Sequence, residues 1–93
     1  MATLTPEQAR AKLARLPGWE LADKAITRTF RFTSFAEAIG FVVRLGFAAE
    51  AADHHPDIDI RYKRVTLTYS THSEGGLTEK DFAGAETATK LAG

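Results

Sequence analysis

The sequence contains no cysteine. Disulfide bonds, thiolate nucleophiles, iron–sulfur clusters and cysteine-ligated zinc are therefore excluded from its chemistry. An excess of charge of either sign is also missing, because twelve basic and twelve acidic residues give a formal net charge of zero. A protein without a positive field lacks the main source of nucleic-acid affinity, so we expect no DNA or RNA partner.

Long apolar runs are missing as well. The longest apolar segment, residues 41–52, is interrupted by Arg44 and Glu50 and is too short to cross a bilayer, so we expect no membrane span. Residues 1–7 have neither the basic start nor the apolar stretch of a signal peptide. We therefore expect a cytoplasmic protein.

The composition that is present indicates one folded domain. Apolar residues make up 44% of the 93 residues and charged residues 26%, which is the balance of an ordinary globular protein. No repeat or low-complexity tract divides the chain, so we predict a single domain over residues 1–93. A chain of this size buries only about 60 to 65% of its unfolded surface, so self-association would help to stabilise it.

Three helix starts are marked by the same local pattern. A hydroxyl side chain can cap the first turn while a side chain three positions later returns a hydrogen bond to the N-cap amide. The pairs are Thr5 with Gln8, Ser34 with Glu37, and Thr78 with Asp81. They predict a helix over residues 6–16, a long helix from residue 35 to the region of residues 50–56, and a helix over residues 79–91. The first helix should stop before Pro17, because a residue that precedes proline disfavours the helical conformation.

The long second helix carries an apolar stripe that is wider than one face. Its main set repeats at helical spacing and consists of Phe35, Ile39, Val42, Val43, Gly46 and Ala49. Phe41, Leu45 and Ala48 widen this stripe, which suggests burial on two sides. We interpret one side as part of the domain's own core and the widening residues as a contact with a partner helix in an oligomer.

Four segments between the helices have the alternation or the composition of strands. They are residues 19–21, 25–32, 57–62 and 64–71, with residues 22–24 as one hairpin connection and Lys63-Arg64 as the tip of the other. The element order is therefore α-β-β-α-β-β-α. It predicts an α+β, two-layer domain in which a four-stranded antiparallel sheet carries three helices on one face.

Two of the three histidines, His54 and His55, stand side by side near the end of the long helix. Imidazole has its unperturbed pKa close to neutrality, so such a pair can donate and accept protons near pH 7. Glu50 and His54 are four residues apart, and we expect both to project from one helix face. Pro56 should force His55 out of the helical conformation, so that the two rings point in different directions.

The third histidine, His72, follows the last predicted strand, and Asp81 lies in the first turn of the third predicted helix. If the strand end and the helix start meet the end of the second helix, one cavity would collect all of these side chains. Other interpretations stay open. His54 and His55 could serve only the helix end, a zinc ion could bind there, or Asp81 could act only as a capping residue.

A family resemblance extends over these residues and beyond them. It is carried by Glu50, the run His54-His55-Pro56, Tyr62, His72 and Asp81, together with residues 17–19 and residues 30–35. In their identity and spacing these residues resemble the signature of the pterin-4a-carbinolamine dehydratase family. The length and the element order are similar too, so the likeness covers almost the whole chain.

The resemblance implies an enzyme that converts 4a-hydroxytetrahydropterin to quinonoid dihydropterin and water, which recycles pterin for an aromatic amino acid hydroxylase. It implies no cofactor and no metal. By this analogy His54 and His72 are the acid and the base, in an order that stays open, and His55 binds substrate with auxiliary proton transfer. Glu50 and Asp81 orient the imidazoles, and Pro56 belongs to the same site.

The resemblance also implies a homodimer or homotetramer, built by joining sheet edges and packing the second helices together. Other functions known in the family are a protein-binding module, either a transcriptional dimerisation cofactor or an assembly chaperone, and a pterin-binding protein. Divergent chaperones of the family tend to lose the histidines. All three histidines are present here, which favours the enzyme.

Overall fold

The computed structural model describes residues 3–93, so residues 1 and 2 of the predicted domain lie outside the described part. The elements follow the predicted order. They are α1 (Pro6–Leu13), β1 (Glu20–Ala22), β2 (Ala25–Arg31), α2 (Phe35–Ala52), β3 (Asp57–Arg61), β4 (Arg64–Tyr69), a 3₁₀ turn, η1 (His72–Glu74), and α3 (Glu79–Ala92).

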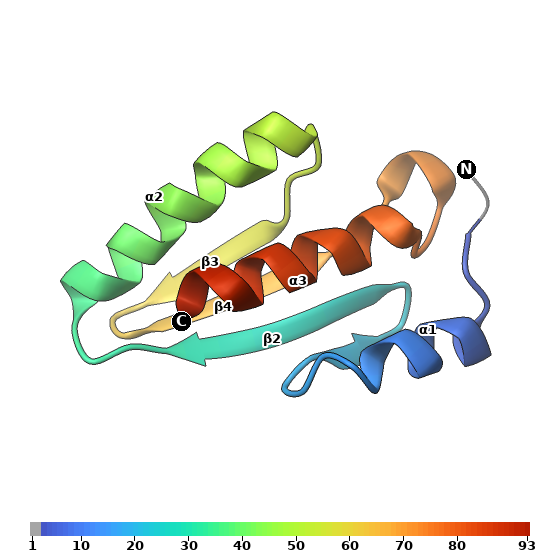
Figure 1. Ribbon diagram of the computed structural model, residues 1–93, viewed down its shortest axis with the longest axis horizontal. Coiled ribbons are helices and arrows are strands. Elements are labelled where there is room, and N and C mark those ends of the chain that lie inside the picture. Colours follow the sequence, from blue (N-terminus) through green and yellow to red (C-terminus); the bar gives the residue numbers. More distant parts are fainter. Residues whose placement is uncertain (1–2) are drawn as a thin grey trace.

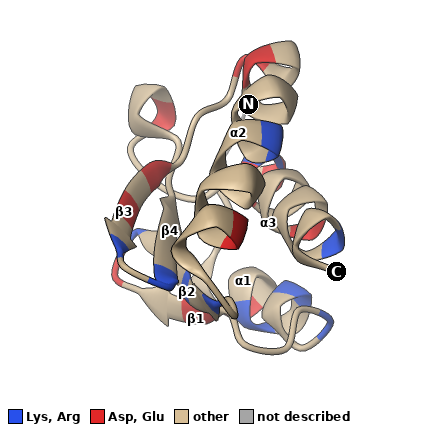
Figure 2. Ribbon diagram, turned by 90° about the vertical axis from the view of Figure 1, so that its left-hand side faces the viewer, with Lys and Arg blue, Asp and Glu red and all other residues tan. Residues whose placement is uncertain are grey.

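The strands form one antiparallel sheet in the order β1-β2-β4-β3. Figures 1 and 2 show α1, α2 and α3 on the same face of this sheet, which leaves the opposite face without a helix. The predicted α+β, two-layer architecture is therefore confirmed. Strand β3 lies at one edge of the sheet, and all five of its residues are exposed.

The helix starts form as their sequences predict. Both hydrogen bonds of the capping box are present at Thr5 and again at Thr78, whereas Ser34 receives only the bond from the Glu37 amide. The Glu37 carboxylate instead accepts a hydrogen bond from Thr33 Oγ1 at 2.6 Å. Helix α1 ends at Leu13, earlier than predicted, because the chain tightens into three-residue turns before the proline at position 17.

Two-residue turns close both hairpins. Asp23 has a φ of 58° in the first turn, and Tyr62 has a φ of 54° in the second. Such left-handed residues match the twist of the flanking strands. The prediction of Lys63-Arg64 as the second tip was wrong by one residue, since Arg64 is already paired with Arg61 in the sheet.

The core of the molecule lies between the sheet and α2 and α3. Phe41 of α2 packs against Phe30 of β2 and against Phe32, with ring centroids 5.1 Å apart in each pair. Its neighbours on the same buried face of α2 are Ala38, Leu45 and Ala49. This spacing of three, four and four residues is the true inward stripe of α2.

The assignment of Phe41 and Leu45 to an intermolecular contact was therefore wrong. Phe41 is 0% exposed within the chain itself, whereas Phe47 on the other side of α2 is 76% exposed. Phe35 and Val43 are also about half exposed. The stripe is wide as predicted, but different residues face outward. Phe35 and Val43 belong to the main set of the predicted stripe, and Phe47 belongs to neither predicted set.

No helix within residues 3–93 combines the length and the apolar character that crossing a membrane requires.

Substitutions on the two sides of α2 should differ in their dependence on protein concentration. Phe41→Ala should lower the free energy of unfolding by about 3 to 5 kcal/mol at every concentration, because it removes a ring from the core. Phe47→Ala should not lower the free energy of unfolding at low protein concentration, since its ring makes few contacts within the chain. Urea denaturation at several concentrations tests this, and a concentration-independent loss for Phe47→Ala as large as that for Phe41→Ala would contradict the core assignment.

Candidate functional site

Helix α2 ends in a way that separates the two adjacent histidines. Asp53 adopts the left-handed conformation, with φ 51° and ψ 41°, and the His54 amide returns to the Ala49 carbonyl at 3.1 Å. This turn takes His54 out of the helix. The expectation that Glu50 and His54 project from one helix face was therefore wrong, and Glu50 pairs with His55 instead.

His54 is bound to the start of α3. Its Nε2 lies 2.6 Å from Asp81 Oδ1, and its side chain is only 13% exposed. Asp81 has no exposed surface. The contact joins side chains 27 residues apart in the chain and fastens the end of α2 to the first turn of α3. The predicted convergence of these two elements is confirmed.

The second oxygen of Asp81 is also fully engaged. Oδ2 accepts a hydrogen bond from Thr71 Oγ1 at 2.8 Å and another from the Thr78 amide at 3.0 Å. Since Thr71 donates to Asp81, the Thr78 hydroxyl donates in turn to Thr71, 2.8 Å away. Asp81 is therefore both a capping residue of α3 and the partner of His54. The interpretation of Asp81 as a capping residue only does not hold.

These contacts assign the tautomer of His54. Asp81 receives two protein donors on Oδ2, as an ionised carboxylate does, so the short contact at Oδ1 is best explained by an N–H donated from Nε2 of His54. A neutral His54 then carries its free lone pair on Nδ1. The ring can accept a proton there and become an imidazolium that faces a buried carboxylate.

The other two histidines lie in more open surroundings. His55 Nε2 lies 2.6 Å from Glu50 Oε1, and both side chains are exposed. His72 is exposed in η1, on the segment that leads from β4 to α3. Pro56 is half-buried and immediately precedes β3. The two adjacent imidazoles take different carboxylate partners, as expected, but the helix ends at Ala52, before Pro56 could act on it.

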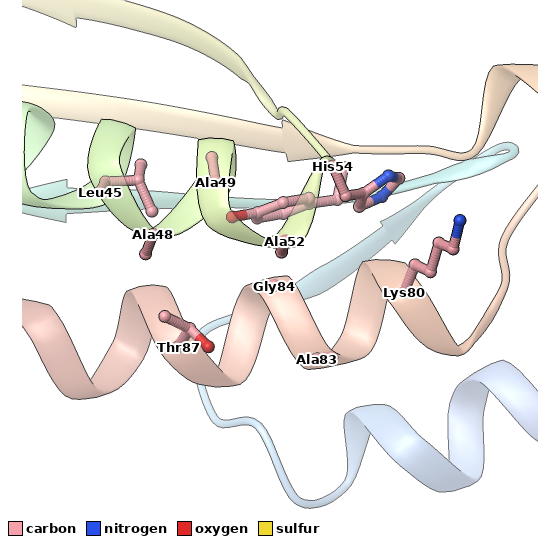
Figure 3. A pocket seen from close by; sticks show the side chains of 10 residues that line it. Leu45, Ala48, Ala49, Ala52, His54, Lys80, Ala83, Gly84 and Thr87 are labelled. Carbon is pink, nitrogen blue, oxygen red and sulfur yellow. The ribbon is translucent and has the colours of Figure 1, made fainter.

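A cavity of about 130 Å³ lies between α2 and α3. Its lining is mostly apolar and consists of Leu45, Ala48, Ala49, Ala52, His54, Tyr69, Lys80, Ala83, Gly84 and Thr87. Figure 3 shows His54 and Lys80 toward one end of it, with Leu45 and Thr87 toward the other. Of the three histidines only His54 contributes to this lining, so the expectation that one cavity collects all three rings is not met.

Tyr69, the last residue of β4, lines the cavity beside His54. The two rings are stacked, with centroids 5.9 Å apart and an angle of 21° between their planes. Burial, with a smaller contribution from the Asp81 carboxylate, raises the pKa of Tyr69 to about 12. The phenol is therefore neutral throughout the physiological range.

Sequence reasoning missed Tyr69, Lys80 and Gly84 as residues of this site. The alternation of residues 64–71 places Tyr69 on one face of its strand but does not mark it as a site residue, and no sequence pattern singles out Lys80 or Gly84. The available signal was their position, because Tyr69 ends the strand that leads to His72 and Lys80 directly precedes Asp81.

The described residues offer no ready metal site. Within residues 3–93 no three His, Asp or Glu side chains gather as ligands of one ion would. The two histidine nitrogens closest to carboxylates are used in pairs with Asp81 and Glu50.

Comparison with known proteins decides the family. A profile described as pterin 4 alpha carbinolamine dehydratase matches residues 2–91. The chain belongs to this family. It is 50% identical, over the full length of both chains, to a protein of Chloroflexus aurantiacus that is provisionally named pterin-4-alpha-carbinolamine dehydratase. A protein of the same provisional name from Mycobacteroides abscessus is 52% identical over 94% of this chain and 93% of its own.

Two solved structures of the pterin dehydratase fold are similar. A transcriptional coactivator/pterin dehydratase from Brucella melitensis has a TM-score of 0.94 and 41% identity, with 98% of this chain and 99% of that chain covered. A pterin dehydratase-like protein described as a RuBisCO assembly factor in the alpha-carboxysome has a TM-score of 0.67 and 25% identity, with 81% and 87% covered. The predicted family is therefore confirmed, and members of this fold include a protein with an assembly role.

The ionisation of Tyr69 can be followed directly. The chain has two tyrosines, so Tyr62→Phe leaves Tyr69 as the only one, and its ultraviolet titration should have a midpoint near pH 12. Because the folded pKa lies above the unfolded value of 10.0, stability is retained below pH 10 and lost as the pH rises toward 12. The loss should be about 1.4 kcal/mol per pH unit in that window. A midpoint near 10 in the folded protein would contradict the burial of this phenol.

Proposed function

We propose that this protein is a 4a-hydroxytetrahydropterin dehydratase that works by histidine acid and base catalysis. The observation that carries the proposal is the His54–Asp81 pair, which combines a nearly buried imidazole with a fully buried carboxylate at one end of a cavity. A chain of the dehydratase family that keeps Glu50, all three histidines and Asp81 has the groups that the reaction needs.

The chemistry requires one proton to be given and one to be taken. The lone pair of the ring nitrogen forms a C=N bond as the C4a–O bond breaks, an acid protonates the departing hydroxyl, and a base removes the nitrogen-bound proton. Water and quinonoid dihydropterin result, and the acid and base together gain and lose no net proton. Two imidazoles can fill both roles near pH 7 without a cofactor.

The contacts of His54 suit it to such a role. Asp81 holds Nε2, which leaves Nδ1 as the atom that exchanges a proton with substrate. A carboxylate that orients an imidazole and faces its protonated form is a common arrangement in proton-transfer sites. His72 supplies the second proton-transfer group in this proposal, and His55, paired with Glu50, contributes to binding.

A protein-binding role is the second candidate, and the exposed apolar rings of α2 favour it. Phe47 and Val43 are exposed on the outer side of that helix. The two similar solved structures carry names that include a transcriptional coactivator and an assembly factor. Such a role is compatible with catalysis, since His54 and Asp81 join the end of α2 to the start of α3 and are not part of this exposed surface. A gene for an aromatic amino acid hydroxylase next to this one would favour pterin recycling.

Catalysis by the histidines is tested with single substitutions on a synthetic carbinolamine. His54→Ala and His72→Ala should each lower kcat by about 10² to 10⁴-fold, the usual contribution of a positioned proton-transfer group. His55→Ala should act mainly on KM. Circular dichroism and calorimetric binding of the dihydropterin product control for folding and for the site's integrity. Full activity in both His54→Ala and His72→Ala would reject the assignment.

Self-association is the other part of the proposal that can be measured simply. We expect a homodimer or homotetramer at micromolar concentration, because β3 is an unpaired edge and Phe47 is an exposed ring on α2. Phe47→Glu should lower the mass seen by light scattering if α2 takes part. A wild-type mass of 10.2 kDa, that of one chain, would remove this expectation.

A further inference from the structure

The ring of Tyr69 packs against two other rings in the interior. It is 2% exposed, and its centroid lies 5.9 Å from that of Trp19 and 5.9 Å from that of His54. The stack with His54 is close to parallel, at 21°. Trp19 is itself fixed, because its indole N–H donates to Thr89 Oγ1 at 2.9 Å. Tyr69 therefore packs against one ring that is fixed by a hydrogen bond and against the imidazole of His54.

The same ring lies directly against the backbone of α3 at Gly84. A Cβ at position 84 would stand 2.5 Å from Tyr69 Cε1 and 2.7 Å from Cζ, distances that force a displacement. An aromatic ring is rigid, so a methyl group at position 84 would displace the whole ring from its present position. Glycine is therefore required at this place in the helix for the ring to occupy its position.

A stacked ring supplies a constraint that the hydrogen bond to Asp81 cannot. The hydrogen bond fixes the position of one atom of the imidazole, Nε2, but it does not by itself fix the plane of the ring. A nearly parallel aromatic ring, with its centroid 5.9 Å away, favours one orientation of that plane. The direction of Nδ1, the atom left for proton exchange, is then set by Tyr69.

We infer that Tyr69 is a positioning residue that sets the plane of the His54 imidazole, and that Gly84 is required because it leaves room for the Tyr69 ring. The catalytic meaning of this inference rests on the proposed dehydratase function. Its structural part does not, because the position of His54 can be observed without any reaction.

Nuclear magnetic resonance of the histidine rings tests the structural part. In Gly84→Ala the displaced Tyr69 ring should change the chemical shifts of the His54 ring protons, and in Tyr69→Leu the ring-current contribution should be lost. Tyr69→Phe keeps the ring and should keep the His54 signals at their wild-type positions. His72 is exposed on η1 and provides an internal reference whose signals should not move.

Gly46→Ala is the matched control for the substitution itself. Gly46 also lies within a helix, but a Cβ there would meet no atom within 4 Å. This variant should leave both the His54 signals and the dehydratase activity unchanged. The comparison separates the effect of filling the space beside Tyr69 from the general effect of replacing a helical glycine with alanine.

Kinetics and a double substitution test the catalytic part. Gly84→Ala should lower kcat by about 10- to 100-fold with a smaller change in KM, as expected when a proton-transfer group is misplaced. In the double variant Gly84→Ala/Tyr69→Leu the new methyl group has space, so its kcat should be no lower than that of Tyr69→Leu alone. This loss of additivity is the sign that the two residues act through one contact.

The outcomes separate this inference from the proposed function. Unmoved His54 signals in both Gly84→Ala and Tyr69→Leu would overturn the positioning role even if the wild-type protein is an active dehydratase. If the His54 signals shift in Gly84→Ala but the wild-type protein has no dehydratase activity, the positioning role is supported and the proposed function is rejected. If Gly84→Ala does not fold, the kcat of Tyr69→Leu compared with that of Tyr69→Phe decides the matter, because a kcat retained in Tyr69→Leu would overturn the positioning role.

Discussion

The hydrogen bond between His54 and Asp81 connects the parts of this protein on which the proposed chemistry depends. One partner follows the end of α2 and the other begins α3, so the bond brings together helices that are separated by a whole β-hairpin in the chain. A fully buried carboxylate is unfavourable unless it is satisfied by donors. Here the Thr71 hydroxyl, the Thr78 amide and the His54 ring supply them, and the start of α3 adds its positive dipole end.

Because Asp81 serves both purposes, folding and the candidate chemistry are coupled at this residue. The capping box that begins α3 holds the carboxylate in place, and the carboxylate then holds the imidazole. The position of His54 Nε2 is thus a consequence of how α3 starts. A site arranged in this way is set before any ligand arrives, which is the condition for efficient proton transfer.

Small side chains along α2 and α3 leave the space beside this pair. Four alanines and Gly84 make up half of the residues that line the cavity, and the ring of Tyr69 lies beside them at the end of β4. The same lack of bulk therefore creates the cavity and admits the ring that backs His54. The outer side of α2 is different in character, since Phe47 is exposed there, and this leaves a second surface for protein contacts.

The sequence by itself determined the element order, the capped helix starts and the family. These follow from local rules, because caps, alternation and spacing are properties of neighbouring residues. Only the tertiary structure decided that Glu50 pairs with His55, that Phe41 faces the core, and that Tyr69 backs His54. The first depends on the left-handed conformation of one residue at the end of α2, and the second on the rotation of that helix against the sheet. The third depends on the contact of a ring with a glycine 15 positions later. None of these features can be derived from the identity of neighbouring residues alone.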